Sequence, residues 1–405
     1  MKWSFRRQNT IYLTFLILVV FIALMQISFD DFLQISAGEQ KGLCLFKRFV
    51  LWFTRLSYVP TLPGLAVPAA KDDGQIVIIY WTKVFTASVS VGNSKKWPFF
   101  YVGKECPVQC TLTADHSKIN EAAAIVVHAR NIEEMPPQDK HPHARWILHS
   151  NESPRFTPAM QSAQIMSKFN FYLSYRLDAD FPLTLFSKPT LKPLPVPFHK
   201  KHRVAAVALY SHCEAIRTAY LVKLMRHFPV HSYGGCLHNV DLPENVSPRG
   251  SSNFAETSME LYKSYKFTIV FMNSDCDYFV DEKLYHALSA GSVPVFIGTD
   301  KIREFLPGYL REAVIEVRDF ATPKLLATYL NRLAKDEVAY SRYLRWKYEG
   351  YDFPRNYSRS VIGKVWDGLP PFCKICMALH SGKKGKNGLA VETCARRNLS
   401  YWIKQ

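Results

Sequence analysis

The sequence predicts an α/β protein with two domains, each built on a doubly wound parallel sheet. Its 405 residues, 48% of them hydrophobic, can form two cores. Short runs of β-branched and aromatic residues alternate with helical segments in both halves of the chain, which is typical of parallel sheets. A Pro-rich run within residues 188–200 separates the two series, and we interpret it as the interdomain linker.

The N-terminal residues have the pattern of a membrane anchor. Residues 1–10 form a short basic tail, and Ile11–Ile27 is almost continuously apolar, near the minimum length for crossing a bilayer. Basic residues before this segment and acidic residues after it predict a type II topology with the N-terminus in the cytosol. A cleaved signal peptide is the alternative, but a poor cleavage site follows. Residues 28–70 are then a stem.

The first domain is predicted at residues 71–187 and the second at residues 201–350. Four strands are expected in the first, within Gln75–Trp81, Ala122–Arg130, Ala144–Pro154 and Phe169–Leu183. The second should contain a strand at Val204–Tyr210, a βαβ unit at Tyr265–Pro307, and helices at Thr218–His227, Pro323–Leu333 and around Tyr340–Tyr348. Residues 351–405 are expected to form an irregular extension that carries a CxxC motif.

The charge balance limits the classes of partner. The chain has 51 Lys and Arg against 34 Asp and Glu, a net charge of +17, which suits nucleic acid, a membrane surface or a phosphorylated substrate. The basic residues are scattered and no nucleic-acid-binding motif accompanies them, so we expect no nucleic-acid partner. A basic surface in a secretory compartment is the simpler interpretation.

Two places carry candidate chemistry. Glu282 and Lys283 stand at a helix start beside the carboxyl edge of the second sheet, where a lysine can meet a phosphate and a carboxylate can hold sugar hydroxyls. Glu152 follows a strand in the first domain and is held by a Ser-Pro turn, so it could be a general base. Charged residues at an ordinary helix start, and a surface glutamate in a turn, are the alternatives.

The CxxC motif, Cys373 and Cys376, admits three interpretations. A zinc site would need a second pair of ligands, a redox motif would need a thioredoxin-like context, and structural disulfides would suit an oxidising compartment. Asn356 and Asn398 stand in Asn-x-Ser sequons, which agree with a lumenal location.

The βαβ unit resembles the donor-binding signature of the α1,3-fucosyltransferase family, glycosyltransferase family 10. That signature has the form YKF-(apolar)-FENS-x-C-x-DY-(I/V)TEK-L-x5-AG-x-VPV-x2-G. The positions in register are YKF at 265–267, Asn273, Ser274, Cys276, Glu282, Lys283, Ala290, Gly291, Val293, Pro294, Val295 and Gly298. The sequence departs from it in having Met272 for Glu, Tyr278 for Asp, Phe279 for Tyr and Asp281 for Thr.

This resemblance implies a GT-B fold, in which two Rossmann-like domains face a cleft. GDP-fucose is then the co-substrate, bound by the second domain without a metal ion or another cofactor. The implied donor-binding residues are Arg217, Asn273, Tyr278, Glu282 and Lys283. A helix arginine in solvent is the alternative for Arg217, because the segment before it is shorter than in the family.

The first domain also resembles the family. Glu152 lies in an ESP motif, which implies the general base, and SYR-x-D implies that Tyr175, Arg176 and Asp178 lie on the acceptor side. The terminal Cys373 and Cys376 are implied to form disulfides with two cysteines of the first domain. Cys106 and Cys110 are the candidates for these two partners, and Cys213 with Cys236 is a further candidate pair.

The implied reaction is an inverting α1,3 transfer of L-fucose to a GlcNAc hydroxyl of a glycoprotein glycan, either the N-glycan core or a Lewis-type antenna. The expected location is the Golgi membrane, or the endoplasmic reticulum, with the catalytic domain in the lumen. A fucosyltransferase that acts on a protein hydroxyl is one alternative. A catalytically weak lumenal glycan-binding protein is another, suggested by Met272 and Phe279.

Overall fold

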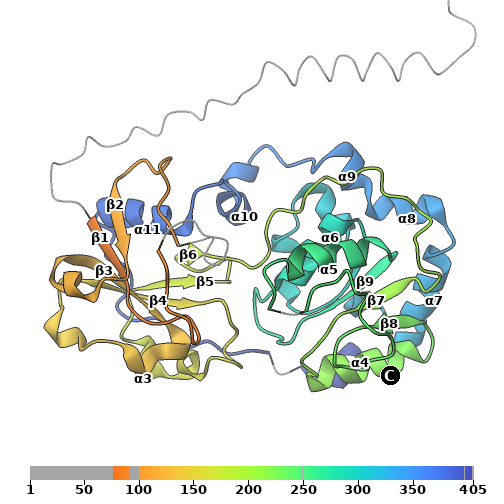
Figure 1. Ribbon diagram of the computed structural model, residues 1–405, viewed down its shortest axis with the longest axis horizontal. Coiled ribbons are helices and arrows are strands. Elements are labelled where there is room, and N and C mark those ends of the chain that lie inside the picture. Colours follow the sequence, from red (N-terminus) through yellow and green to blue (C-terminus); the bar gives the residue numbers. More distant parts are fainter. Residues whose placement is uncertain (1–75, 92–99, 249, 396, 404–405) are drawn as a thin grey trace, which may run out of the picture. The chain divides into compact units, whose positions relative to one another are not determined.

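The computed structural model describes residues 76–91, 100–248, 250–395 and 397–403 (Figure 1). The tail, anchor and stem expected at residues 1–70 lie outside these residues. In the part that is described, no helix has both the length and the apolar character needed to cross a bilayer.

The N-terminal lobe is built on a six-stranded sheet in which every strand pair is parallel. The strand order is β2-β1-β3-β4-β5-β6. The strands are β1 (Ile76–Tyr80), β2 (Cys110–Thr113), β3 (Ala122–His128), β4 (Arg145–Ser150), β5 (Phe171–Ser174) and β6 (Phe181–Pro182). Four 3-10 helices (His116–Glu121, Ala129–Glu134, Gln138–Lys140 and Pro158–Gln161) and α3 (Ala163–Met166) connect them.

The C-terminal lobe is built on a five-stranded parallel sheet with the order β11-β10-β9-β7-β8. Its strands are β7 (Ala206–Ala208), β8 (Val230–Ser232), β9 (Phe267–Phe271), β10 (Val293–Ile297) and β11 (Ile315–Glu316). Its α-helices are α4 (Ala215–Met225), α5 (Phe254–Lys263), α6 (Glu282–Ala290), α7 (Pro323–Leu333), α8 (Glu337–Tyr343) and α9 (Arg345–Glu349). Its 3-10 helices are Asp300–Glu304, Gly308–Glu312 and Val317–Asp319.

The expected α/β class with parallel sheets is confirmed. All five residues of β9 and of β10 are buried, as expected for strands covered on both faces. Helices α4 and α7 pack on one face of this sheet, and α5 and α6 lie on the other. In both lobes the first strand lies between the second and the third, so each sheet has the 2-1-3-4-5 order of doubly wound folds.

Helix α6 begins and ends where local sequence dictates. The Asp281 carboxylate accepts a hydrogen bond from the Lys283 amide, and Gly291 ends the helix in the left-handed conformation with φ of 71°. A Cβ atom at Gly291 would also lie 2.9 Å from the Val196 side chain. Glycine therefore satisfies both the backbone and the packing at this position.

Two helix predictions need correction. Helix α4 begins at Ala215 rather than Thr218, because the Glu214 carboxylate caps it by accepting from two backbone amides. The helix expected around Tyr340–Tyr348 is two helices, α8 and α9, which meet at Leu344 outside helical geometry.

The expectation of an irregular C-terminal extension was wrong. It contains α10 (Val361–Val365), α11 (Pro371–His380), α12 (Leu399–Trp402) and the 3-10 helix Tyr357–Arg359. Helix α11 carries the CxxC motif and packs against the N-terminal sheet through Phe372, Cys373, Ile375 and Cys376. The proline at its first position suits a helix start, and this local signal was overlooked.

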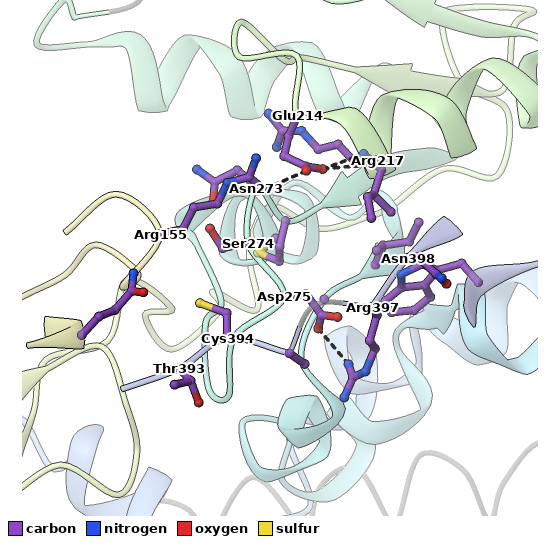
Figure 2. A pocket seen from close by; sticks show the side chains of 17 residues that line it. Arg155, Glu214, Arg217, Asn273, Ser274, Asp275, Thr393, Cys394, Arg397 and Asn398 are labelled. Atoms are coloured by element: carbon purple, nitrogen blue, oxygen red, sulfur yellow. Dashed lines mark hydrogen bonds and ion pairs between the residues drawn. The ribbon is translucent and has the colours of Figure 1, made fainter. Parts of the chain in front are cut away.

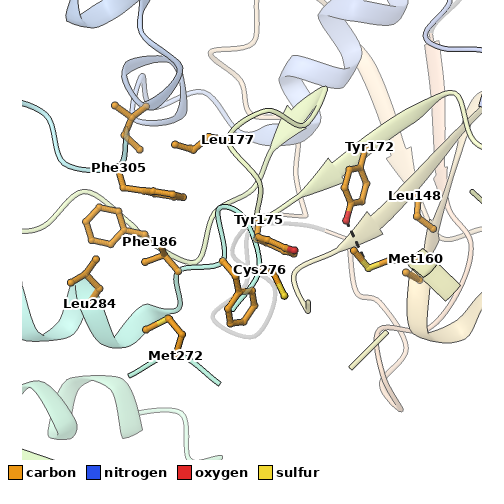
Figure 3. Close-up of a cluster of buried hydrophobic side chains, with 14 of the residues drawn as sticks. Leu148, Met160, Tyr172, Tyr175, Leu177, Phe186, Met272, Cys276, Leu284 and Phe305 are labelled. Atoms are coloured by element: carbon orange, nitrogen blue, oxygen red, sulfur yellow. Dashed lines mark hydrogen bonds between the residues drawn. The ribbon is translucent and has the colours of Figure 1, made fainter. Parts of the chain in front are cut away.

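The two lobes share one hydrophobic cluster. The Tyr175 ring, after β5, meets the Phe279 ring, from the loop before α6, edge to face with centroids 5.2 Å apart. Figure 3 shows Tyr175 beside Cys276, with Phe186 and Phe305 further along the same cluster. Apolar contacts therefore join the end of the first sheet to the loop that follows β9.

The last segment of the chain runs from one lobe to the other. We call residues 383–395 and 397–403 the C-terminal strap. On the N-terminal lobe its backbone amides donate to Asn170 O, Met166 O and Met160 O at 2.8, 3.0 and 2.9 Å. It then reaches the C-terminal lobe, where Trp402 is buried in the core with α4 and α7.

Candidate active site

A cavity of about 680 Å³ lies at the carboxyl edge of the second sheet (Figure 2). It is bordered by the residues after β7, β9 and β10, and thus stands where the strand order reverses between β7 and β9. Ligands of doubly wound sheets bind at this position. The residues that line it are Arg155, Gln161, Glu214, Ile216, Arg217, Met272, Asn273, Ser274, Asp275, Ile297, Gly298, Thr393, Cys394, Ala395, Arg397, Asn398 and Trp402.

Three polar atoms of the cavity lack a partner. Arg217 Nε, Asn273 Oδ1 and Asp275 Oδ2 are buried and have no hydrogen-bond partner among the described residues. Buried polar atoms in folded proteins are nearly always paired, so three unpaired ones around one cavity indicate a polar ligand. One of these atoms is a donor and two are acceptors.

Arg217 supplies positive charge to the cavity. Its guanidinium donates to Phe271 O at 3.0 Å and to His212 O, and it lies 4.6 Å from the centre of the Tyr210 ring. No carboxylate among the described residues forms an ion pair with it. These contacts hold an uncompensated cation next to the switch point, which is suited to a phosphate.

Lys283 lies at the start of α6 between two carboxylates. Its Nζ is 2.7 Å from Asp281 Oδ2 and 3.5 Å from Glu282 Oε1. Burial alone would lower the pKa of Lys283, but the two carboxylates outweigh burial and the pKa is raised. The lysine is therefore a permanent cation at neutral pH.

Glu152 stands at the carboxyl end of β4, in the other lobe. Ser150 Oγ accepts from the Glu152 amide at 3.2 Å and donates to Glu152 O at 2.9 Å, which fixes the turn. Burial raises the pKa of Glu152, Arg130 opposes this rise, and the Glu282 and Asp281 carboxylates add to it. The fold thus brings Glu152 within electrostatic range of the start of α6. A carboxylate with a raised pKa in such surroundings is suited to general-base catalysis.

The residues expected on the acceptor side are bound to protein groups. Tyr175 donates its hydroxyl to Glu392 Oε2 at 3.2 Å. Arg176 donates to both oxygens of Asp178 at 2.7 Å, and its guanidinium lies 5.3 Å from the centre of the Tyr278 ring. These side chains form a network that connects the first lobe to the strap and to the loop before α6.

Tyr278 does not line the cavity. Its hydroxyl donates to Glu304 Oε2 at 3.1 Å, and its backbone has φ of 60°. Asn273 and Arg217 do line the cavity, whereas Glu282 and Lys283 lie at the start of α6 and are not among its lining residues. Of the five residues expected to bind the donor, two therefore border this cavity directly.

Two of the departures from the family signature occupy different surroundings. Met272 lines the cavity, and its Sδ lies 3.3 Å from the Asp281 amide, which donates to it. Phe279 is 2% exposed and packs in the shared hydrophobic cluster, away from the cavity lining. The missing tyrosine hydroxyl at position 279 would therefore enter a hydrophobic core in this protein.

Four disulfides stabilise the described part of the chain. Cys106 pairs with Cys373 and Cys110 with Cys376, so that α11 is bonded to residues of the N-terminal lobe. Cys213 pairs with Cys236 beside the start of α4. The fourth disulfide, Cys276–Cys394, connects the loop after β9 to the strap.

Sequence reasoning missed the fourth disulfide and the ion pair beside it. Arg397 of the strap donates to Asp275 Oδ1 at 2.8 Å and also to Asp300. One signal was present, because the three candidate pairs leave three of the nine cysteines unassigned, namely Cys44, Cys276 and Cys394. No sequence pattern marks the Arg397–Asp275 pair.

The structure also places the asparagines of the two sequons and two aspartates of the first lobe. Asn356 and Asn398 are exposed, and Asn398 also borders the cavity. Asp178 is paired with Arg176, and Asp180 Oδ2 accepts from the Tyr172 amide at 3.0 Å. Among the described residues, no group of three or more His, Cys, Asp or Glu side chains is arranged to hold a metal ion.

Comparison with known proteins gives the family. Residues 73–185 match the model of the fucosyltransferase N-terminal domain, and residues 198–392 match that of the glycosyltransferase family 10 (fucosyltransferase) C-terminal domain. The chain is 28% identical over 311 residues to α-(1,3)-fucosyltransferase B of Drosophila melanogaster, which covers 70% of this chain and 69% of that protein.

It is also similar to GDP-fucose protein O-fucosyltransferase 3. The Danio rerio protein is 33% identical over 53% of this chain, and the Homo sapiens protein is 32% identical over 54%. The alignments span 48% of each relative, so the chain spans about half the length of these two proteins. A crystal structure of an α1,3-fucosyltransferase with GDP-fucose is 16% identical, with a TM-score of 0.47, and the match covers 79% of this chain and 94% of that one.

The two family models together extend over both lobes, and the second match ends within the strap, at residue 392. The relatives that carry the sequence similarity are fucosyltransferases of two named kinds. This chain therefore belongs to the fucosyltransferases of glycosyltransferase family 10.

Proposed function

We propose that this protein transfers L-fucose from GDP-fucose to an acceptor hydroxyl, with inversion at the anomeric carbon. One observation carries the proposal: a cavity with an uncompensated arginine and unpaired polar atoms lies at the switch point of the second sheet, while Glu152 comes from the other lobe. A donor on one lobe and a base on the other are what a single displacement requires.

The proposed reaction is a single displacement. The acceptor oxygen attacks fucose C1 as the bond from C1 to the diphosphate oxygen breaks, and Glu152 takes the acceptor proton. Arg217 and Lys283 offset the charge that develops on the leaving GDP. Glu282 Oε1 lies 3.5 Å from Lys283 Nζ. The Glu282 carboxylate is proposed to accept hydrogen bonds from the fucose hydroxyls.

The first proposed acceptor is a GlcNAc hydroxyl of a glycoprotein glycan, joined in α1,3 linkage. The similarity to the Drosophila α-(1,3)-fucosyltransferase supports it. A protein hydroxyl is the second candidate. Seven relatives that are 30–33% identical bear the name GDP-fucose protein O-fucosyltransferase 3, which favours this alternative.

The proposed location is the lumen of the Golgi or the endoplasmic reticulum. Four disulfides support an oxidising compartment, because such bonds are rare in the cytosol. The apolar segment Ile11–Ile27 would be the anchor.

The test is GDP release from GDP-fucose by the full chain with two acceptor panels, one of N-glycans and antennae and one of folded secretory protein domains. Turnover by the unaltered protein with either panel, together with its loss in Glu152→Gln, supports the proposal. The panel that gives turnover identifies the class of acceptor. Glycan binding without turnover by the unaltered protein would instead favour the catalytically weak glycan-binding protein. Equal turnover in Glu152→Gln would refute the assignment of the base.

A further inference from the structure

We propose that the C-terminal strap builds the nucleoside end of the donor cavity, where Asp275 recognises the base and Arg397 positions Asp275. The proposal rests on the proposed function, since it names the part of GDP-fucose that this end of the cavity would hold. Six of the cavity's lining residues belong to the strap: Thr393, Cys394, Ala395, Arg397, Asn398 and Trp402. The match to the family model ends at residue 392, and these six residues follow it in the chain.

The strap is fastened at three points around the cavity. The Cys276–Cys394 disulfide joins it to the loop after β9, with Cα atoms 4.1 Å apart. Arg397 pairs with Asp275 in the same loop and with Asp300 after β10. Trp402, 2% exposed, is buried in the core, and the Arg318 guanidinium lies 5.5 Å from its ring centre. The strap is therefore a fixed wall rather than a loose tail.

The strap is also fastened to the other lobe just before the cavity. The Glu392 amide donates to Met160 O at 2.9 Å, and the Glu392 carboxylate accepts from the Tyr175 hydroxyl at 3.2 Å. The path from Glu392 to Cys394 thus crosses between the lobes at the rim of the cavity. Contacts with both lobes therefore set the position of the wall.

The cavity has two chemically different ends. Arg217 brings an uncompensated cation, which suits the diphosphate. Asp275 brings a carboxylate, which would repel a diphosphate but can accept hydrogen bonds from neutral N–H groups. Figure 2 shows Arg397 against Asp275, with the dashed line between them. This pair uses Oδ1, and the buried Oδ2 has no hydrogen-bond partner among the described residues.

A carboxylate matches guanine because the ring presents two adjacent N–H donors, at N1 and at the 2-amino group. Ile216, Ile297 and Trp402 supply apolar surface in the same cavity for a planar base. Burial raises the pKa of Asp275 to about 6 despite the opposing charges of Arg397 and Arg318, and a carboxyl group with this pKa is mostly ionised at neutral pH. Arg397 acts through Asp275 and is a positioning residue.

The test is calorimetric titration of the full chain with GDP and with inosine diphosphate, which lacks the 2-amino group. We expect the unaltered protein to bind GDP about tenfold more tightly than inosine diphosphate, the effect of one buried hydrogen bond. Asp275→Asn should bring this ratio close to one. Arg397→Ala should lower the ratio, and Arg397→Lys should restore part of it.

The role of the strap is tested with two disulfide variants. Cys276→Ser with Cys394→Ser should weaken GDP binding about tenfold or more, because the wall loses its covalent anchor. Cys110→Ser with Cys376→Ser removes a disulfide of the N-terminal lobe and should leave GDP binding unchanged. Thermal unfolding of each variant checks that it is folded at the assay temperature.

The outcomes separate this inference from the proposed function. Suppose that the unaltered protein binds GDP, and that the double variant Cys276→Ser with Cys394→Ser and the variant Asp275→Asn bind it with the same affinity. This result would overturn the assignment of the nucleoside end and leave the proposed function intact. Tighter GDP binding in Asp275→Asn also overturns it, since it would mean that the carboxylate faces the diphosphate. Absence of GDP binding by the unaltered protein overturns both.

Discussion

The hydroxyl groups of Ser153 and Ser274 lie 2.7 Å apart and form a buried hydrogen bond between the two lobes. Ser153 follows the proposed base Glu152, and Ser274 follows Asn273 of the cavity. The hydrogen bond therefore connects the turn that carries the base directly to the loop that borders the donor cavity.

We expect Ser274→Ala to lower the free energy of unfolding by about 1–3 kcal/mol, because the Ser153 hydroxyl is left buried and unpaired. The double variant with Ser153→Ala should be less destabilised than the sum of the single variants. Denaturant unfolding of the four proteins measures this coupling. Strict additivity would show that the two hydroxyls do not interact in solution.

Glu152→Gln should lower kcat/KM by about 10²–10⁴-fold, because the amide cannot take a proton from the acceptor. GDP affinity should be unchanged, since Glu152 does not line the cavity. Glu133→Gln, at an exposed position of the same lobe, is the control and should have the activity of the unaltered protein. A parallel loss of GDP binding would mean that Glu152 holds the donor.

The acid limb of the pH–rate profile should report Glu152. A base must be ionised to act, and the pKa of Glu152 is raised by burial, so activity should be present above this pKa and be lost as the pH falls through it. Lys283 lowers the pKa of Glu152, and Lys283→Ala should therefore move the acid limb to higher pH.

Lys283→Ala should also lower kcat by about 10²–10³-fold, because a cation near the leaving group is lost. Lys324→Ala removes an exposed cation at the start of α7 and serves as the control. A pH profile of Lys283→Ala that keeps its acid limb in place would contradict the electrostatic link between the two lobes.

Phe279→Tyr restores the family residue but should not raise activity. The new hydroxyl would enter the cluster beside Tyr175, and we expect a loss of about 1–3 kcal/mol in the free energy of unfolding. Phe85→Tyr, at an aromatic side chain that is 44% exposed, should have little effect. Higher activity with unchanged stability would show that position 279 faces the donor.

Local signals made much of the C-terminal lobe predictable. Helix α6 has a capping carboxylate, Asp281, at one end and a left-handed glycine, Gly291, at the other. The runs that become β9 and β10 are continuously apolar. Such features act between residues that are close in the chain, so a sequence pattern can reveal them.

The surroundings of Tyr278 could not be predicted in the same way. Whether its ring faces a ligand or a neighbouring side chain depends on a left-handed backbone and on Arg176 and Glu304, which lie in other elements. Alternation along an extended segment does not apply to a residue in that conformation. The docking of α11 on the first sheet likewise depends on partners such as Cys106, 267 residues away in the chain.

The α/β class, the parallel sheets, the family and the residue types for donor and base chemistry could all be predicted from the sequence, because short runs and fixed spacings carry them. The proximity of Glu152 to Lys283, the contact between Ser153 and Ser274, and the closure of the cavity by the strap became visible only in the folded chain. These contacts join residues that are far apart in the chain, where no local pattern links them. The Cys276–Cys394 disulfide, for example, joins residues 118 positions apart.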